Sequence, residues 1–389
     1  MPDGREPTTV NVIGSINEVE AAEWDACAGA DHPFCSHGFL SALEDSGSAA
    51  AESGWVPRHL AVRDENGVLL ACAPLYLKNH SYGEYVFDWG WADAYERAGG
   101  NYYPKLQCAV PFTPASGRRL LMRGDLPADT RKELSHALVQ AMVTMAERLG
   151  VSSLHITFPP EDEWQGLGQL GLLQRIGQQY HWQNRGYETF DDFLGDLTSR
   201  KRKTIRKERA AVVAHGLDIK TLTGTDITEA HWDAFYRFYR DTIDKKWGQN
   251  YLNRDFFSLL GERIGESIVL VMVESGGRPV AGALNIQGGD TLFGRNWGCD
   301  ANFKFLHFET CYYQAIDYAI ANGLKWVEAG AQGPHKVQRG YLPRPTYSAH
   351  WIADQELKAA IERFLVEERR DIEHDMQMLA ARSPFKKPD

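Results

Sequence analysis

The chain has 389 residues, of which 43% are hydrophobic and 24% are charged. This length suggests two or three domains, and the composition is that of a globular protein, which excludes a disordered chain or a fibrous repeat. No apolar run approaches the roughly 18 to 20 residues of a membrane-spanning helix. The N-terminal residues lack a signal-peptide pattern, and the six cysteines form no Cys-x-x-Cys pair. We therefore expect a cytoplasmic protein without a membrane span, a disulfide framework or a metal site.

The net charge of −10 argues against a general nucleic-acid-binding protein. Positive charge is nevertheless concentrated in residues 200–209, whose sequence RKRKTIRKER holds seven of the 42 basic residues. Two interpretations are open. The segment is either a binding site for an acidic ligand or the solvated face of a helix.

The first half of the chain predicts alternating helices and strands. Asn66-Gly67 lies between two apolar runs and indicates a β-hairpin, and apolar residues at helical spacing end at Gly150. The expected elements are helices at 17–27 and 36–46, strands at 55–63, 68–78 and 85–89, a helix at 129–149 and a strand at 152–158.

The second half predicts a similar order. The expected elements are helices at 189–197, 199–214, 228–246 and 254–264, strands at 217–222, 267–274, 278–287 and 291–297, a helix at 308–321, a strand at 324–328 and a charged helix at 354–381.

The two halves can be aligned directly. The hairpin sequences place Ala71 opposite Ala281, and the ends of the long helices place Gly150 opposite Gly323. The first half is longer between these points, which indicates an extra segment at about 93–123. Two copies of one mixed α/β unit explain this pattern. We expect domains at 10–185 and 186–353, followed by a C-terminal helix at 354–383.

This order of elements resembles the GNAT acyltransferase fold, so the expected fold class is α/β with a mixed sheet in two tandem GNAT-like domains. The resemblance implies that two neighbouring strands part at their middle. The opened backbone N–H groups would then bind the donor chain and stabilise an oxyanion, while a helix N-terminus binds pyrophosphate.

Several segments resemble the FemAB-like peptidoglycan biosynthesis/recognition family in the same order, from about residue 12 to residue 352. They are the aromatic and charged stretch at 80–121 and the sequences KRKTIRKERA, HWDAFYRFYRDTIDKKWG, HFETCYYQAIDYAI and GAQGPHKVQRGYLP. One position departs from the family pattern. Pro334 stands where the family usually has an acid.

Acyl transfer to an amine requires a proton acceptor, a site for the oxyanion and a proton for the leaving group. Glu309 is the first candidate base, and His335 is an alternative because imidazole titrates near neutral pH. Tyr313 and Tyr341 are candidate proton donors. A glutamate on a helix is more often a surface residue, so a structural role for Glu309 stays open.

Charged and aromatic side chains could bind the acceptor through hydrogen bonds and ring stacking. The alternative is a structural core with internal ion pairs. The candidates are Asp88, Trp91, Asp93, Tyr95, Arg97, Tyr103 and Lys105 in the first half, with Lys336 and Arg339 in the second.

Phosphates of the donor would bind to Arg202, Arg206, Arg209 and Arg295. The nearest match to the GNAT phosphate loop, at 295–300, fails at its last position, so acyl-CoA is a candidate co-substrate that this motif does not secure. The resemblance implies aminoacyl-tRNA as the other candidate donor. We expect no permanently bound cofactor.

The sequence thus predicts an N-acyltransferase that acts on an amine acceptor such as a peptidoglycan precursor. Two alternatives stay open. One is a binding protein with a degenerate GNAT fold, and the other is acylation of an unrelated small-molecule amine. The C-terminal helix could also support a homodimer.

Overall fold

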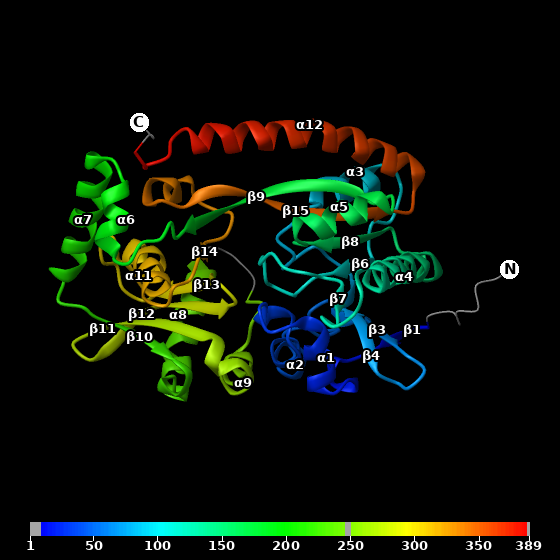
Figure 1. Cartoon of the computed structure of the whole chain (residues 1–389), viewed down its shortest axis with the longest axis horizontal. Helices are drawn as coiled ribbons and strands as arrows, with labels where there is room; N and C mark the ends of the chain where they lie inside the picture. The colour runs from blue at the N-terminus through cyan, green and yellow to red at the C-terminus, as the bar shows by residue number, and fades with distance from the viewer. Residues whose placement is uncertain (1–8, 246–249, 387–389) are drawn as a thin grey trace. The chain divides into compact units, whose positions relative to one another are not determined.

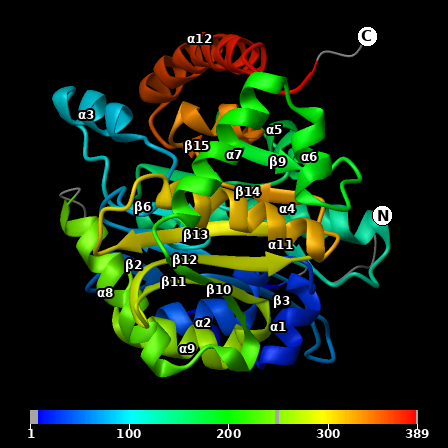
Figure 2. The same cartoon turned by 90° about the vertical axis from the view of Figure 1, so that its left-hand side faces the viewer.

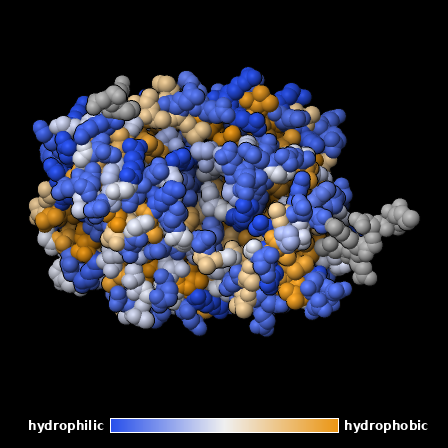
Figure 3. Space-filling model, viewed as in Figure 1, coloured by the Kyte–Doolittle hydropathy of each residue, from blue (hydrophilic) through white to orange (hydrophobic). Residues whose placement is uncertain are grey.

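The computed structural model describes residues 9–245 and 250–386. The chain divides into two compact units. Unit 1 comprises the residues up to Gly177 with Thr346–Arg370, and unit 2 comprises Gln178–Pro345 with the residues from Asp371 onward. Each unit therefore includes a segment from a distant part of the chain. Within the described ranges, no helix combines the length and apolarity needed to cross a membrane. The face drawn in Figure 3 is mostly hydrophilic, with hydrophobic residues in separate patches.

Unit 1 is built around two groups of strands (Figure 1). Its elements are β1 (Val10–Ile13), α1 (Ala21–Ala28), α2 (His37–Asp45), β2 (Trp55–Pro57), β3 (His59–Arg63), β4 (Leu69–Ala73), β5 (Leu75–Lys78), α3 (Trp89–Arg97), β6 (Lys105–Cys108), β7 (Leu121–Met122), α4 (Ala128–Leu149), β8 (Ser153–Thr157) and α5 (Glu161–Gln169). One sheet has the order β1-β3-β4-β7. The other strands pair in the order β2-β5-β6-β8, and β8 is parallel to β6. Leu138 and Met142 of α4 pack into the core formed by these strands.

Unit 2 has its strands in the order β10-β11-β12-β13-β14 (Figure 2). Its elements are α6 (Phe190–Asp196), α7 (Ser199–Val213), β10 (Asp218–Thr223), α8 (Glu229–Lys245), α9 (Arg254–Ile264), β11 (Ile268–Ser275), β12 (Arg278–Gly288), β13 (Thr291–Cys299), α10 (Leu306–Phe308), the π-helix η5 (Glu309–Tyr313), α11 (Gln314–Ala321), β14 (Trp326–Glu328) and the 3-10 helix η6 (Pro334–Arg339).

Three further elements run from one unit into the other along the chain: β9 (Leu173–Gln183), β15 (Leu342–Ile352) and α12 (Gln355–Ala380). In unit 1, Ser348–Ile352 of β15 pairs antiparallel with β8. In unit 2, residues 181–183 of β9 pair antiparallel with β14. The last strand of each unit is thus supplied by a remote segment, which the sequence analysis did not predict.

The predicted hairpins are confirmed, and they match each other in detail. In unit 1, Val62 pairs with Ala71, and the register shifts after Val62. In unit 2, Val273 pairs with Ala281, and the register shifts after Val273. The same bulge at the same place in both hairpins supports a duplicated unit, because bulges are specific features of a fold.

The long helices end in the same way in both units. Gly150 follows α4 with φ +63°, and Gly323 follows α11 with φ +65°. A left-handed residue after a helix turns the chain sharply, and glycine adopts it without a Cβ clash. The next strand, β8 or β14, then returns to the sheet. The sequence alignment of the two halves placed Gly150 opposite Gly323, and the structure agrees with this match.

One expectation for the first half is wrong, and a second is borne out in part. Residues 85–89 form no strand, and α3 begins at Trp89 instead. The extra residues of unit 1 form two stretches, which both overlap the predicted segment at 93–123. Residues 79–104 separate β5 from β6, whereas only Gly289 and Asp290 separate β12 from β13. A second insertion, at 109–120, separates β6 from β7.

In unit 2 the pairing of β13 with β14 ends before β13 does, at the place where the GNAT resemblance implied a parting of two strands. Strands β13 and β14 are parallel and pair only where Thr291–Phe293 faces Trp326–Glu328. β13 then continues to Cys299, while the N–H of Ala329 donates to the carbonyl of Tyr180 in β9. In unit 1 the corresponding parallel pairing of β6 with β8 also comprises three residue pairs, but β6 ends with that pairing at Cys108.

Two paired glycines let α8 approach the sheet of unit 2. Gly282 on β12 lies opposite Gly298 on β13. A Cβ at Gly298 would stand 2.2 Å from the carbonyl oxygen of Phe238 in α8, and a Cβ at Gly282 would stand 3.0 Å from the ring of Phe235. The helix therefore packs directly on the backbone of β13.

We predict that Gly298→Ala lowers the free energy of unfolding by about 1–3 kcal/mol, because the added methyl group overpacks a contact with backbone atoms. Thermal and urea unfolding would measure the change. Gly166→Ala is the matched control, since Gly166 lies in α5 with no atom within 4 Å of an added Cβ. It should leave stability unchanged or higher. Equal melting temperatures for Gly298→Ala and the native chain would contradict this packing.

Candidate functional site

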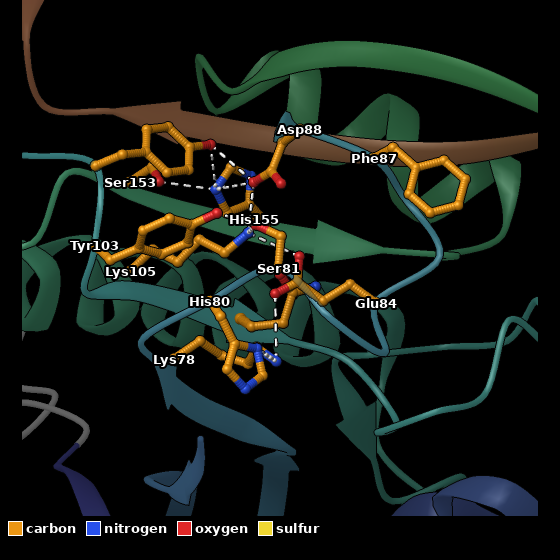
Figure 4. Close-up of polar contacts among 12 residues, drawn as sticks. Lys78, His80, Ser81, Glu84, Phe87, Asp88, Tyr103, Lys105, Ser153 and His155 are labelled. Carbon is orange, nitrogen blue, oxygen red and sulfur yellow. Dashed lines mark hydrogen bonds and ion pairs between the residues drawn. The ribbon is translucent and has the colours of Figure 1, made fainter. Parts of the chain in front are cut away.

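Each unit contains a cluster of buried polar side chains that includes predicted site residues. The Lys105 cluster of unit 1 is centred on the Lys105 amine (Figure 4). Its Nζ donates hydrogen bonds to Ser81 Oγ at 2.8 Å, Glu84 Oε2 at 2.7 Å and Asp88 Oδ2 at 2.5 Å. The side chain of Lys105 is fully buried. All three acceptors come from the insertion between β5 and β6, so the lysine attaches this insertion to the sheet.

A second lysine, Lys78, lies next to the Lys105 cluster and contacts one of its two carboxylates. Lys78 at the end of β5 lies directly opposite Lys105 at the start of β6. Like charges in this position repel each other. Lys78 Nζ lies 3.6 Å from Glu84 Oε1, and Asp88 also accepts a hydrogen bond from Tyr102 at 2.8 Å. Lys105 thus contacts two buried carboxylates, and it shares one of them, Glu84, with Lys78.

Burial and charge move the pKa values of this cluster in different directions. Burial raises the pKa of Glu84 to about 7 and lowers that of Lys78 to about 7. For Asp88 burial opposes ionisation, but the Lys105 ammonium outweighs it and holds the pKa well below its usual range. His155, whose Nε2 lies 3.6 Å from Asp88 Oδ2, has its pKa lowered to about 3 by burial. The cluster therefore keeps Asp88 charged and His155 neutral.

The structure brings together only part of the predicted acceptor set. Asp88, Tyr103 and Lys105 belong to the Lys105 cluster, where Tyr103 OH and Ser81 Oγ are 2.8 Å apart. Trp91 is buried in an apolar cluster against which Tyr95 packs. The remaining two predicted residues of the first half, Asp93 and Arg97, are exposed on α3. Sequence analysis missed the contributions of Lys78, Ser81, Glu84 and His155.

In unit 2, the helix after β13 contains a π-helical turn at Glu309–Tyr313, between α10 and α11. Such turns are rare and occur frequently at functional sites. Three of the predicted catalytic residues, Glu309, Tyr313 and Tyr341, lie in this turn or hydrogen-bond near it.

Glu309 is buried and forms an ion pair with the partly exposed Arg209. Its Oε1 accepts hydrogen bonds from Arg209 at 2.9 Å and from Gln314 at 2.8 Å. Arg209 also donates to Asp317 at 2.6 Å and lies over the ring of Phe190. Arg209 therefore has two carboxylate partners, which makes it a poor phosphate ligand, and Glu309 lies in a structural arrangement.

A second ion pair joins α7 to η6. Arg339 Nη2 donates to Glu208 at 2.9 and 3.0 Å, and Tyr313 OH also donates to Glu208. The predicted substrate ligand Arg339 is thus occupied by Glu208. Sequence analysis missed Glu208, although it lies at helical spacing between the buried Ile205 and Val212. An acid on the apolar stripe of a basic helix indicates a buried ion pair.

The predicted tyrosine donors both have acceptors inside the protein. Tyr341 OH donates to the backbone carbonyl of Tyr312 at 3.0 Å, and Tyr313 OH donates to Glu208. Burial raises the pKa of both phenols. A proton that is held in this way is not readily transferred to a leaving group.

His335 differs from these residues because its own side chain is exposed. It lies in residues 329–340, which we call the His335 loop. Its Nε2 lies 3.2 Å from Tyr312 OH. Burial lowers its pKa below 6.5, and the nearby charges of Arg339 and Lys336 lower it further. The imidazole is therefore mostly neutral at pH 7 and able to accept a proton.

Hydrogen bonds from the Lys336 side chain and a close approach at Gly333 fix the conformation of the His335 loop. Lys336 Nζ donates to the carbonyl of Ala329 and, at 3.3 Å, to that of Gly330. Burial lowers the pKa of Lys336 to about 8. Gly333 has φ +98°, and a Cβ there would stand 2.4 Å from the His335 ring. Ala329 directly follows Glu328, where β14 parts from β13, so this loop begins at the parting point.

The predicted phosphate ligands are dispersed. Arg206 pairs with Asp191 at 2.8 Å on the surface, whereas Arg202 is half-buried and has no ion pair among the described residues. Arg295 lies within β13 rather than in the loop before α10. Exposed basic side chains of α7 include Arg200, Lys203 and Lys207. Across the described ranges, no group of three His, Cys, Asp or Glu side chains is arranged to hold a metal ion.

We predict that Lys105→Met lowers the free energy of unfolding by about 3–5 kcal/mol, because it leaves Glu84 and Asp88 buried without their cation. Chemical denaturation at pH 7 would measure the loss. Lys132→Met on the exposed face of α4 is the control and should stay within about 0.5 kcal/mol of the native value. A similarly small effect of Lys105→Met would contradict the ion pairing described above.

Comparisons with solved structures identify the fold. FemX matches with a TM-score of 0.56 and 13% identity, over 88% of this chain and 98% of that chain. The C-terminal domain of a provisionally named lysylphosphatidylglycerol synthetase from Agrobacterium fabrum matches with a TM-score of 0.55 and 10% identity, over 90% and 97%. L-PGS from Bacillus licheniformis matches with a TM-score of 0.51 and 9% identity, over 87% and 98%.

At these identities the likeness concerns the fold. The two units are GNAT-like domains in tandem, as their repeated hairpins and helices predicted. No curated protein matches the chain. The family model FemAB-like, described as peptidoglycan biosynthesis/recognition, matches residues 15–387. The chain therefore belongs to the FemAB-like family.

Proposed function

We propose that this protein transfers an acyl or aminoacyl group from an activated donor to an amine, and that the acceptor is a peptidoglycan precursor. One observation carries the proposal: the neutral imidazole of His335 stands on a loop that begins where β13 and β14 part. Membership of the FemAB-like family supports the class of acceptor. The likeness to FemX, at 13% identity, supports the fold alone.

The reaction divides into proton transfer and carbonyl chemistry. If Nε2–H of His335 donates to Tyr312 OH, then Nδ1 is left to accept a proton from the amine. The amine nitrogen forms a bond to the carbonyl carbon, and the bond from that carbon to the donor's sulfur or oxygen breaks. The protonated His335 then gives the proton that it accepted from the amine to the leaving sulfur or oxygen, which restores the neutral imidazole. Backbone N–H groups of β13 beyond Phe293, on the edge that no longer pairs with β14, are the candidates for stabilising the oxyanion.

The donor carries phosphates in both candidate forms, acyl-CoA and aminoacyl-tRNA. Exposed Arg200, Lys203 and Lys207 of α7 are better placed to bind phosphates than Arg209, which is paired with Glu309 and Asp317. Neither donor is a permanently bound cofactor in this proposal. A cytoplasmic location and a homodimer stay predictions from the sequence.

A second candidate function is ligand binding without turnover. The specific observation in its favour is that Glu309, Tyr313 and Tyr341 all have partners within the protein. Incubation with acetyl-CoA or charged tRNA and a panel of amines, including unrelated small-molecule amines, separates the two functions. Ligand binding without thiol release or deacylation of tRNA would favour the binding protein.

We predict that His335→Gln lowers turnover at least 100-fold with little change in KM, because it removes the proton acceptor. In the native protein the rate should fall as the pH drops below the lowered pKa of His335, and this acid limb should be absent from the residual activity of the variant. Steady-state rates between pH 5 and 8 test both points. His136→Gln, exposed on α4, is the control. Native turnover in His335→Gln would exclude His335 as the base.

We also predict that changing Arg200, Lys203 and Lys207 together to Gln raises the KM for the donor at least tenfold at low salt and flattens its salt dependence, because fewer phosphate contacts release fewer counterions. The control changes Arg131, Lys132 and Arg148 of α4 in the same way. If the α7 variant behaves like this control, the basic helix is a solvated face and the donor binds elsewhere.

A further inference from the structure

Residues 82–89 in unit 1 expose aromatic side chains. Among the described residues five aromatic side chains stand out as exposed, and four of them lie in this short segment. They are Tyr82, Tyr85, Phe87 and Trp89, with exposed fractions of 41–54%, and the fifth is Phe364 on α12. Clusters of exposed apolar side chains commonly mark binding sites.

The same segment buries its charges. Glu84 and Asp88 are 4% and 2% exposed, and both accept hydrogen bonds from Lys105. Figure 4 shows these carboxylates directed into the Lys105 cluster while the ring of Phe87 points away from it. Folding stability alone favours buried aromatic rings and exposed charges. This segment has the opposite arrangement, with exposed rings and buried charges. Such a local reversal is expected where a function requires it.

The rings support one another. Phe87 and Trp89 are stacked with centroids 5.0 Å apart and an interplanar angle of 29°. Tyr82 meets Trp89 edge-on at 6.0 Å. The backbone is fixed as well, because Arg175 donates to the carbonyl of Phe87 at 2.8 Å while it pairs with Glu368. A ligand would therefore meet a preorganised surface, and little side-chain ordering would oppose its binding.

A polar group stands beside the rings. Trp89 is the first residue of α3, and Asp93 follows it at i+4, so the two side chains share one face of the helix. Asp93 is exposed. An aromatic face beside a carboxylate suits a pyranose ring, whose C–H face packs on the aromatic ring while its hydroxyl groups donate to the carboxylate.

We propose that Tyr82, Phe87 and Trp89, which we call the aromatic platform, bind a saccharide and that Asp93 accepts a hydrogen bond from it. The family description, which names peptidoglycan, supports a glycan as the occupant. The net charge of −10 and the exposed Asp93 disfavour an anionic membrane. This site goes beyond acyl transfer, because saccharide binding needs no turnover.

Tri-N-acetylchitotriose is the probe, and calorimetry on the full chain measures its affinity. Trp89→Ala should weaken binding at least tenfold, and Asp93→Asn should weaken it at least threefold. Phe364→Ala, which removes an exposed aromatic ring on α12, is the matched control and should bind as the native chain does. Far-UV circular dichroism and melting temperature establish that each variant is folded.

Native affinity in a folded Trp89→Ala variant would overturn the proposal. Absence of binding by the native chain at millimolar trisaccharide would also overturn it, as would Trp89-dependent binding to phosphatidylcholine or phosphatidylglycerol vesicles without binding of the trisaccharide. His335→Gln distinguishes this proposal from the transfer function. If that variant keeps native turnover but the aromatic platform binds the trisaccharide, only the proposed function fails.

Discussion

Buried cations determine the shape of both polar clusters. In unit 1, Lys78 and Lys105 face each other on paired strands, and the chain must supply carboxylates to balance them. Glu84 and Asp88 do so by turning inward, which leaves the intervening aromatic rings outside. In unit 2, Arg339 requires Glu208, and this pair attaches η6 to α7. The pairing of buried cations with carboxylates thus positions the aromatic platform in unit 1. It also contributes to the position of the His335 loop in unit 2.

Local patterns were sufficient to predict most of the fold. The Asn66-Gly67 turn, the helical apolar spacing and the left-handed Gly150 and Gly323 depend on neighbouring residues, so the sequence carries them directly. The contribution of a remote strand to each unit was not predictable in this way. The pairing of β15 with β8, for example, joins residues nearly 200 positions apart. The strand expected at 85–89 is wrong because aromatic residues favour strands in general, whereas here the ion pairs with Lys105 determine the conformation.

The residue types alone were a poor guide to the candidate site, because the partners of a side chain decide whether it is available for catalysis. Glu309, Tyr313 and Tyr341 have the right chemistry for proton transfer, but each hydrogen-bonds inside the protein, and one sequence does not reveal those partners. His335 lies in the glycine- and proline-containing sequence GAQGPHKVQRGYLP, and the structure leaves its side chain exposed. Asp88 and Lys105 were found because charges within an aromatic run need partners when they are buried.

Pro334 connects the departure from the family pattern to the chemistry. Proline has a fixed φ and no N–H, so it suits the first position of η6 and helps to begin that turn directly before His335. An acid at this position would offer a carboxylate, whose ordinary pKa lies near 4. The imidazole of His335 belongs to the matching part of the pattern, and its pKa is lowered below 6.5 because burial and two neighbouring cations disfavour its charged form. The missing acid at position 334 therefore leaves His335 as the candidate base of the loop.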